Sequence, residues 1–385
     1  MASKTRIHAV FPNYCGGVWV SYTFISLLNT MQGEETDTHA YALGRAATMD
    51  RARVSALLPN VLYNHTSKLF SNPCGAIVRR FAHRFRPGDV AYLWMNGPEP
   101  VVRKLQKRGL FVAREMINCT MLLRRRELRA AYALLGLGDQ SGISDRDIEC
   151  ERADLLAADA VFCPNDFVLE SVIDYGVPPE RCIPTSYGWG EDRIAANSEH
   201  VKSGAGVDVL FAGTGDVRKG LPWLLEAWER AGIEGRLLLA GLLDDAVRTR
   251  YSRILARPDV CELGYVKDIA RVYQSADIFC FPSWEEGGPM VTIEAMASGL
   301  PCIVTPMGGA GLVKDSHNGI IIRPGDVDGI AAAIRCLASN ESARKELGGR
   351  ALATARDFTW QAVGERRARA LMQMVRARGS GMKRS

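Results

Sequence analysis

The sequence predicts an α/β protein with two open parallel sheets. Short apolar runs typical of buried strands alternate with longer runs of helical periodicity, which is the pattern of strand–helix–strand units. This pattern stops in a stretch rich in Pro and Gly, Cys182 to Gly190, and restarts at Val207. The length of 385 residues also fits two domains. We therefore expect one Rossmann-like domain over residues 1–187 and a second over residues 188–359.

In the first half, strands are expected at Ile7–Phe11, Val90–Trp94, Leu110–Ala113 and Ala160–Cys163. A glycine turn follows the first strand, and an amphipathic helix is predicted over Val18–Met31. A second helix is predicted over Ser144–Leu156. Helices between short strands indicate crossover connections in a parallel sheet.

After the boundary, strands are expected at Val207–Ala212, Arg236–Ala240, Ile278–Phe281 and Cys302–Thr305. Helices are predicted over Leu221–Ala231 and from Pro289, because proline suits the first helical position. A final helix at about residues 360–378 is expected to pack back on the first domain.

The composition, 47% hydrophobic and 24% charged, is typical of a globular protein. No apolar run reaches the roughly 18 residues that a membrane span needs, and no secretory signal is visible. The ten cysteines are scattered without a C-x-x-C pair, which favours reduced thiols. We expect a cytoplasmic protein.

Positive charge is concentrated near the amino terminus. Residues 1–136 contain 19 Lys and Arg against 8 Asp and Glu. The basic groups cluster at 79–86, 103–108 and 124–129, and such clusters suit an anionic partner. Aromatic residues are not interleaved with the last cluster, so nucleic acid is not the expected partner. Peripheral contact with the inner face of an anionic membrane and a plain solvated helix face remain as interpretations.

The most informative stretch runs from Pro282 to Pro301. A buried strand ends in a loop with Gly287 and Gly288, and Pro289 then opens a helix. Such a helix start exposes unpaired N–H groups and the positive end of the helix dipole, which together bind anions. The flanking carboxylates, Glu286 and Glu294, suit the hydroxyl groups of sugars, which donate hydrogen bonds. A diphosphate between hydroxylated rings describes a nucleotide sugar.

A second segment, Phe211 to Gly220, again reads as strand, glycine turn and helix. Its adjacent cations, Arg218 and Lys219, would neutralise a diphosphate and stabilise the charge that develops as it leaves. The segment is not a P-loop, because Gly220 follows Lys219.

Together these motifs resemble the family 4 type of retaining glycosyltransferases with the GT-B fold (glycosyl transferases group 1). The resemblance rests on Glu286 and Glu294 at the family's spacing, on Lys219-Gly220, on the 263–266 segment and on Asn318-Gly319. It implies two Rossmann-like domains that face a central cleft. It also implies transfer of a hexose from a UDP- or GDP-linked sugar to a saccharide or lipid-linked acceptor, in polysaccharide or glycolipid biosynthesis. Neither a metal nor another cofactor is expected.

The resemblance also assigns roles to residues. Glu286, Lys219 and Arg218 are the expected catalytic residues. Donor binding falls to Gly16, Gly17, Gly213, Thr214, Tyr265, Val266, the backbone of Gly287, Gly288, Pro289 and Met290, and Glu294. The acceptor candidates of the first domain are Arg114, Glu115 and Asn118. Thr214 stands where the family usually has arginine, and Asn118 stands near a position where it often has histidine.

Other interpretations remain open. A nucleotide-sugar epimerase on a similar frame would need no acceptor, and a non-catalytic subunit of a glycan assembly complex would need no chemistry. The two D-x-D spacings, at Asp145 and Asp326, are better explained as helix caps than as a metal site. Glu285 is expected to be a solvated residue or a loop anchor.

Overall fold

The computed structural model describes residues 4–17, 20–50, 53–60, 63, 69–95, 97–194 and 206–381. The chain forms two compact units. The first unit contains residues 1–121, 144–187 and 360–385, and the second contains residues 122–143 and 188–359. The expected start of the first helix at Val18 and most of the polar passage that follows Gly190 lie outside the described residues.

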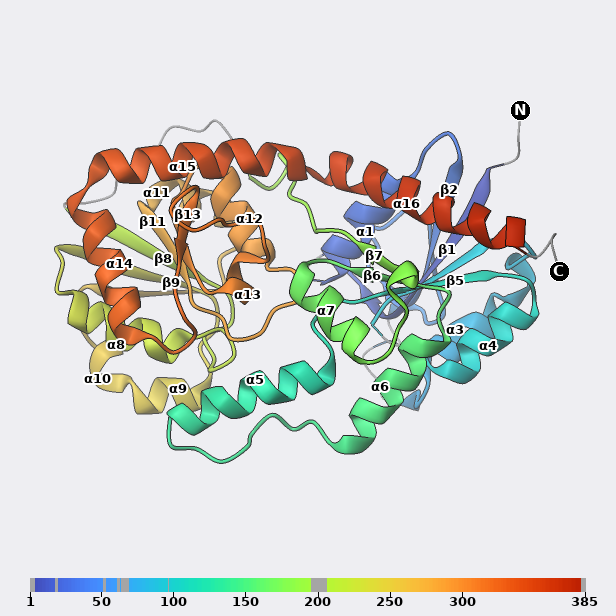
Figure 1. Cartoon of the computed structure of the whole chain (residues 1–385), viewed down its shortest axis with the longest axis horizontal. Helices are drawn as coiled ribbons and strands as arrows, with labels where there is room; N and C mark the ends of the chain where they lie inside the picture. The colour runs from blue at the N-terminus through green and yellow to red at the C-terminus, as the bar shows by residue number, and fades with distance from the viewer. Residues whose placement is uncertain are drawn as a thin grey trace. The chain divides into compact units, whose positions relative to one another are not determined.

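Residues 122–143 belong to the second unit, which corrects the expectation that residues 1–187 form the first domain. They contain most of helix α5 (Met121–Leu134), drawn in blue-green in Figure 1, and are grouped with the second unit. The reason is packing: Ala131 and Leu135 are buried in the same hydrophobic cluster as Val217 and Leu221 of that unit.

The first unit is built on a parallel sheet of seven strands in the order β3-β2-β1-β4-β5-β6-β7. Its strands are β1 (Thr5–Cys15), β2 (Thr36–Arg45), β3 (Val54–Ala56), β4 (Val90–Leu93), β5 (Phe111–Glu115), β6 (Ala160–Cys163) and β7 (Cys182–Pro184). Strands β4 and β6 are buried at every residue, as expected of parallel strands covered on both faces.

The helices of the first unit are α1 (Val20–Met31), α3 (Pro73–Arg80), α4 (Glu99–Lys107), α6 (Asp145–Ala157), α7 (Asp166–Asp174) and α16 (Trp360–Gly381), with 3₁₀ turns at Ala82–Arg84 and Pro179–Arg181. Successive residues of β1 point to opposite faces, so Phe11 stacks on Phe24 of α1 while Val10 packs toward Ile77 of α3. Helix α16, in red in Figure 1, packs along α1. There is no room for a side chain at Gly364, where a Cβ would lie 2.1 Å from Thr30 Oγ1.

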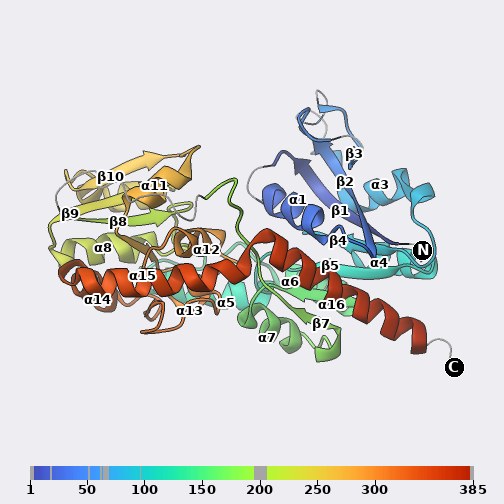
Figure 2. The same ribbon diagram turned by 90° about the horizontal axis from the view of Figure 1, so that it is seen from above.

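The second unit contains a parallel sheet of six strands in the order β10-β9-β8-β11-β12-β13, part of which is visible in Figure 2. The strands are β8 (Val207–Ala212), β9 (Gly235–Ala240), β10 (Val260–Gly264), β11 (Ile278–Phe281), β12 (Cys302–Val304) and β13 (Gly319–Ile321). Besides α5, the helices are α8 (Leu221–Ala231), α9 (Asp245–Arg250), α10 (Ser252–Leu255), α11 (Ile269–Ser275), α12 (Met290–Ala297), α13 (Pro306–Gly309), α14 (Val327–Ser339) and α15 (Glu341–Ala355), with a 3₁₀ turn at Arg356–Phe358.

Each sheet has one point at which the strand order reverses. In the second unit the chain runs outward from β8 through β9 to β10, and then resumes on the other side of β8 with β11. In the first unit the same reversal separates β1 from β4. Ligands of open α/β sheets bind at the carboxyl ends of the strands at such a switch point. The loops after β8 and β11 are therefore the first place to look for a site.

None of the helices in the part of the chain that the structure describes is long and apolar enough to cross a membrane.

Candidate functional site

The loops after β8 and β11 pack directly on each other. The peptide N–H of Trp284 donates to the carbonyl oxygen of Arg218 at 2.8 Å. Gly220, at φ 77°, lies against the other loop so closely that a Cβ there would meet the carbonyl oxygen of Pro282 at 2.0 Å. The two predicted motifs thus form one structure, and Gly220 lets their backbones touch.

We expect Gly220→Ala to destabilise the protein more than Gly232→Ala does. Both glycines have positive φ, but a Cβ at Gly232 meets nothing within 4 Å. The left-handed backbone alone costs about 1–2 kcal/mol for alanine, and the clash at Gly220 adds to this cost. Chemical denaturation of both variants measures the difference, and equal losses would show that the loops do not need this close contact.

Lys219 and Glu286 form an ion pair between these loops, with the Lys219 ammonium group directly on Oε1 of Glu286. The hydroxyl of Ser283 lies 3.0 Å from the same oxygen. Both side chains are largely buried, with 15% of the Lys219 side chain and 7% of the Glu286 side chain exposed. Oε2 of Glu286 has no partner among the residues that the structure describes. This carboxylate is fixed in place yet still has an acceptor oxygen to offer.

Arg218, the other predicted cation, pairs instead with Glu285. Its Nη1 lies 3.2 Å from Oε2 of Glu285, and Nε of Arg124 on α5 lies 3.6 Å from the same oxygen. Against the desolvation that burial imposes, the surrounding carboxylates, with Glu286 first, raise the pKa of Arg218. Glu285 is therefore a fully buried anchor between two arginines and is not solvated.

Helix α12 follows these loops and begins without a side-chain cap. Pro289 occupies the N-cap position and offers no side-chain oxygen to the first turn. The N–H groups of the first turn are the ones that a helix cannot pair internally, and the helix dipole adds positive potential there. This helix start lies directly after Glu286 and the glycines 287 and 288, so the predicted anion site is next to the Lys219–Glu286 pair.

Glu294 lies one turn further along α12 and is almost completely buried. Its Oε1 pairs with Nε of Arg193 at 2.9 Å, and the Tyr273 hydroxyl donates to its Oε2 at 3.2 Å. Burial raises the pKa of Glu294 to about 7, although Arg193 and Tyr273 oppose this shift.

The raised pKa of Glu294 predicts a pH-dependent stability. The ordinary pKa of a glutamate is about 4.3, so between that pH and about 7 the folded state binds more protons than the unfolded state. The free energy of unfolding should then fall as pH rises through this window and level off above it. Glu294→Gln removes the titration. The difference between wild type and variant, measured by denaturation from pH 5 to pH 8, should decline with pH, and a constant difference would contradict the assignment.

Tyr265 and Val266, the residues predicted to contact the base, directly follow the carboxyl end of β10. Tyr265 is 60% exposed, and Leu242 and Leu263 beside it are also exposed. Val266 is half-buried and Thr214 is exposed. Gly213, at φ 137°, turns the chain after β8. Exposed apolar groups at a sheet edge suit a flat aromatic ligand, and the roles of these residues stay predictions.

In the first unit, Gly16 and Gly17 follow β1 at the switch point, as the motif predicts. Gly17 has φ 73°, and a Cβ there would meet Met49 Cε at 2.8 Å. The Gly16 N–H donates to the Ser21 hydroxyl at 3.3 Å. Asn118 is half-buried in the loop after β5.

Arg114, at the end of β5, is buried with part of its guanidinium unpaired. Its Nη2 donates to the Met95 carbonyl at 2.9 Å, while Nε and Nη1 have no hydrogen-bond partner in the described part of the chain. Burial lowers the pKa of Arg114. Its role as an acceptor residue remains a prediction.

The carboxylate of Glu115 is buried in the interior of the first unit. Both of its oxygens contact the guanidinium of Arg367 on α16, at 2.9 and 3.2 Å, and both side chains are fully buried. The hydroxyls of Tyr92 and Tyr187 also donate to this carboxylate. Glu115 thus has a structural role, and its buried carboxylate is not accessible to an acceptor. Arg367, which the sequence analysis missed, is its counterion.

The aspartates of the two D-x-D spacings act at helix ends. Ser144 and Asp147 form a capping box at the start of α6, and Asp326 accepts from the N–H of Gly329 at the start of α14 at 2.8 Å. Across the described ranges, no cluster of three or more His, Cys, Asp or Glu could hold a metal ion.

Residues 206–340 match the family model described as glycosyl transferases group 1. O-antigen chain mannosyltransferase B of Escherichia coli is 33% identical over 168 residues, which is 40% of this chain and 42% of that protein. The match therefore spans less than half the length of this curated relative.

Two solved structures share the fold over nearly the whole chain. HepE of Anabaena, in complex with UDP and glucose, has a TM-score of 0.72 at 15% identity, covering 96% of this chain and 100% of that one. Sucrose-phosphate synthase of Thermosynechococcus elongatus has a TM-score of 0.73 at 17% identity, covering 97% and 100%. The expected GT-B fold of two α/β domains is confirmed.

Proposed function

Because residues 206–340 match the family model of glycosyl transferases group 1, we propose that the protein is a glycosyltransferase that uses a nucleotide sugar. The donor is a UDP- or GDP-linked hexose, and the acceptor is a saccharide or a lipid-linked saccharide of a surface polysaccharide or glycolipid. The relation to an O-antigen mannosyltransferase supports this class of product. Glu294 would hold the ribose, and Tyr265 and Val266 would contact the base.

The observation that carries the proposal is the Lys219–Glu286 pair beside the uncapped start of α12. Lys219 and the N–H groups of the helix would bind the diphosphate, and Arg218 adds positive charge nearby. The unpartnered oxygen of Glu286 would accept a hydrogen bond from a hydroxyl of the donor sugar. Diphosphate and sugar recognition thus come from adjacent residues of one loop pair.

We propose that transfer retains the anomeric configuration of the donor. The acceptor attacks the face from which the nucleotide departs, and a donor phosphate oxygen takes the acceptor proton. The protein then contributes positioning and stabilisation of the charge on the leaving diphosphate, which is the role of Lys219. Glu286 is held by Lys219 and Ser283 and orients the sugar. This scheme needs no metal.

Incubation with a panel of UDP- and GDP-sugars, with and without saccharide acceptors, tests the function. A glycosyltransferase releases free nucleotide and forms a new glycosidic bond, whose configuration NMR reports. An epimerase would return an altered nucleotide sugar without free nucleotide. A protein that neither binds nor turns over any of these donors would contradict the proposal.

We also propose peripheral contact with an anionic membrane through cations of the first unit. Those exposed on α3, on α4 and between α3 and β4 are Arg79, Arg80, Arg84, Arg86, Arg103, Lys104 and Lys107. Each cation near an anionic surface contributes about 1 kcal/mol, so Arg80→Ala/Lys104→Ala should lower partitioning onto phosphatidylglycerol vesicles roughly tenfold or more. Lys345→Ala in the second unit is the control, and equal co-sedimentation of all three proteins would exclude this surface.

A further inference from the structure

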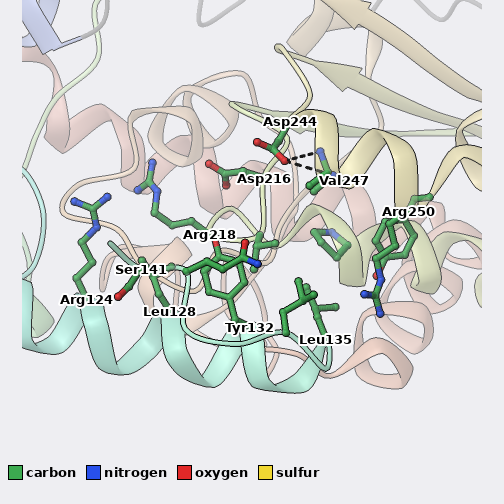
Figure 3. Close-up of a pocket in the computed structure, with 16 residues that line it drawn as sticks. Arg124, Leu128, Tyr132, Leu135, Ser141, Asp216, Arg218, Asp244, Val247 and Arg250 are labelled. Carbon is green, nitrogen blue, oxygen red and sulfur yellow. Dashed lines mark hydrogen bonds between the residues drawn. The ribbon is translucent and has the colours of Figure 1, made fainter. Parts of the chain in front are cut away.

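A cavity of about 380 Å³ lies in the second unit, next to the loop after β8. Arg218 lines this cavity, whereas Lys219, Glu286 and Glu294 do not. Helix α5 forms one wall, and the loop after β8 together with α9 forms the other (Figure 3). The volume is in the range of small-molecule sites in proteins. Every residue that lines it belongs to the same unit.

The wall supplied by α5 combines aliphatic groups and an aromatic ring with the guanidinium group of Arg124. Leu128 and Tyr132 project from the helix into the cavity, and Leu135 follows the end of the helix (Figure 3). Val247 of α9 lines the cavity as well. Tyr132 is half-buried. An aromatic ring beside aliphatic groups offers a flat surface to the apolar face of a sugar ring.

Two carboxylates also line the cavity. Oδ1 of Asp216 accepts from the Lys219 N–H at 2.7 Å, and Oδ1 of Asp244 accepts from the Ala246 N–H at 2.9 Å. Neither Oδ2 has a partner among the residues described. These oxygens are fixed acceptors, and hydroxyl groups are the donors that suit them.

The charges around the cavity balance. Three arginines line it, at positions 124, 218 and 250, together with the two aspartates. The carboxylate of Glu285, which does not line the cavity, pairs with both Arg124 and Arg218. Nε of Arg124 is buried and has no hydrogen-bond partner among the residues that the structure describes. Donors, acceptors and an aromatic face without net charge favour a neutral, hydroxyl-rich ligand over an anionic one.

We propose that this cavity binds one or two neutral sugar rings of the acceptor, in addition to the acceptor contacts predicted for Arg114 and Asn118 of the first unit. The assignment to the acceptor rests on the proposed function. Asp216 and Arg218 line the cavity, and the next residue, Lys219, contacts Glu286. A saccharide in the cavity would therefore contact the 213–220 loop on the side that faces α5. The same loop carries Lys219, the proposed diphosphate-binding residue.

The test uses the full-length protein and methyl glycosides of mannose, galactose and N-acetylglucosamine as probes. Ala246→Trp fills the cavity from its exposed edge, and Ala133→Trp is the matched control on an exposed position of α5 that does not line it. Saturation-transfer NMR at about 10 mM glycoside detects affinities in the millimolar range. Titration with UDP and GDP is a separate measurement on the same samples.

At least one glycoside should bind the wild type and Ala133→Trp, with signals about fivefold weaker in Ala246→Trp and a similar loss in Tyr132→Ala. Nucleotide binding should be equal in all four proteins, which also shows that they are folded. Absence of glycoside binding, or equal binding by Ala246→Trp, overturns the proposal. Failure of the proposed function appears differently, as absence of nucleotide binding, and leaves the glycoside result to decide the cavity.

Discussion

Replacement of Lys219 by alanine is expected to lower kcat by about 10²–10³, because the developing charge on the diphosphate loses its nearest fixed cation. Glu286→Gln should show a comparable loss, since an amide keeps the shape of the carboxylate but releases the Lys219 ion pair and weakens the grip on the sugar hydroxyl. Both rates are measured by nucleotide release with the donor that the wild type accepts.

Lys345→Ala is the control for this pair, because Lys345 is 77% exposed on α15 and pairs with Glu341 of the same helix. Its rate should equal that of the wild type. Normal rates for Lys219→Ala and Glu286→Gln would remove both residues from the site, whatever the reaction proves to be.

Arg367→Met is expected to destabilise the first unit by about 3–5 kcal/mol, because it leaves the Glu115 carboxylate buried without a counterion. Arg367 also donates to the carbonyl oxygen of Ser186, at 3.1 and 3.0 Å. The double variant Glu115→Gln/Arg367→Met should recover part of the loss, because no charge then remains buried.

Denaturation of Arg369→Met, an exposed arginine on the same helix, provides the comparison. Its free energy of unfolding should change little, since substitutions of exposed residues are usually within about 0.5 kcal/mol. Equal stabilities of Arg367→Met and Arg369→Met would contradict the structural role given to Arg367 and would reopen Glu115 as a ligand residue.

The strands that are buried on both faces were predictable from sequence. The expected strands at Val207–Ala212 and Ile278–Phe281 coincide with β8 and β11 because continuous apolar runs between turn residues have few other interpretations. Strand β2 (Thr36–Arg45) was missed because its sequence mixes polar and apolar residues without a clear period. The glycine turn before Lys219 and the proline before α12 were visible because local backbone geometry demands those residue types.

Contacts between distant parts of the chain could not be predicted in this way. Arg367 lies in a basic helix and looks like a surface residue, and its partner Glu115 is 252 residues away. Helix α5 buries only Leu128 and Ala131 in its own length, too weak a stripe to show which unit it packs on. For the same reason the sequence did not decide whether Glu285 is a solvated residue or a loop anchor, since one of the two arginines that pair with it, Arg124, comes from α5.

Diphosphate binding by Lys219 is tested most directly by calorimetric titration of UDP and GDP into wild type, Lys219→Ala and Lys345→Ala. We expect at least one nucleotide to bind the wild type and Lys345→Ala equally and to bind Lys219→Ala about tenfold or more weakly, the effect of losing one charge-assisted contact. Equal affinity of all three proteins, or no binding of either nucleotide, would contradict the claim that these loops hold the diphosphate of a nucleotide sugar.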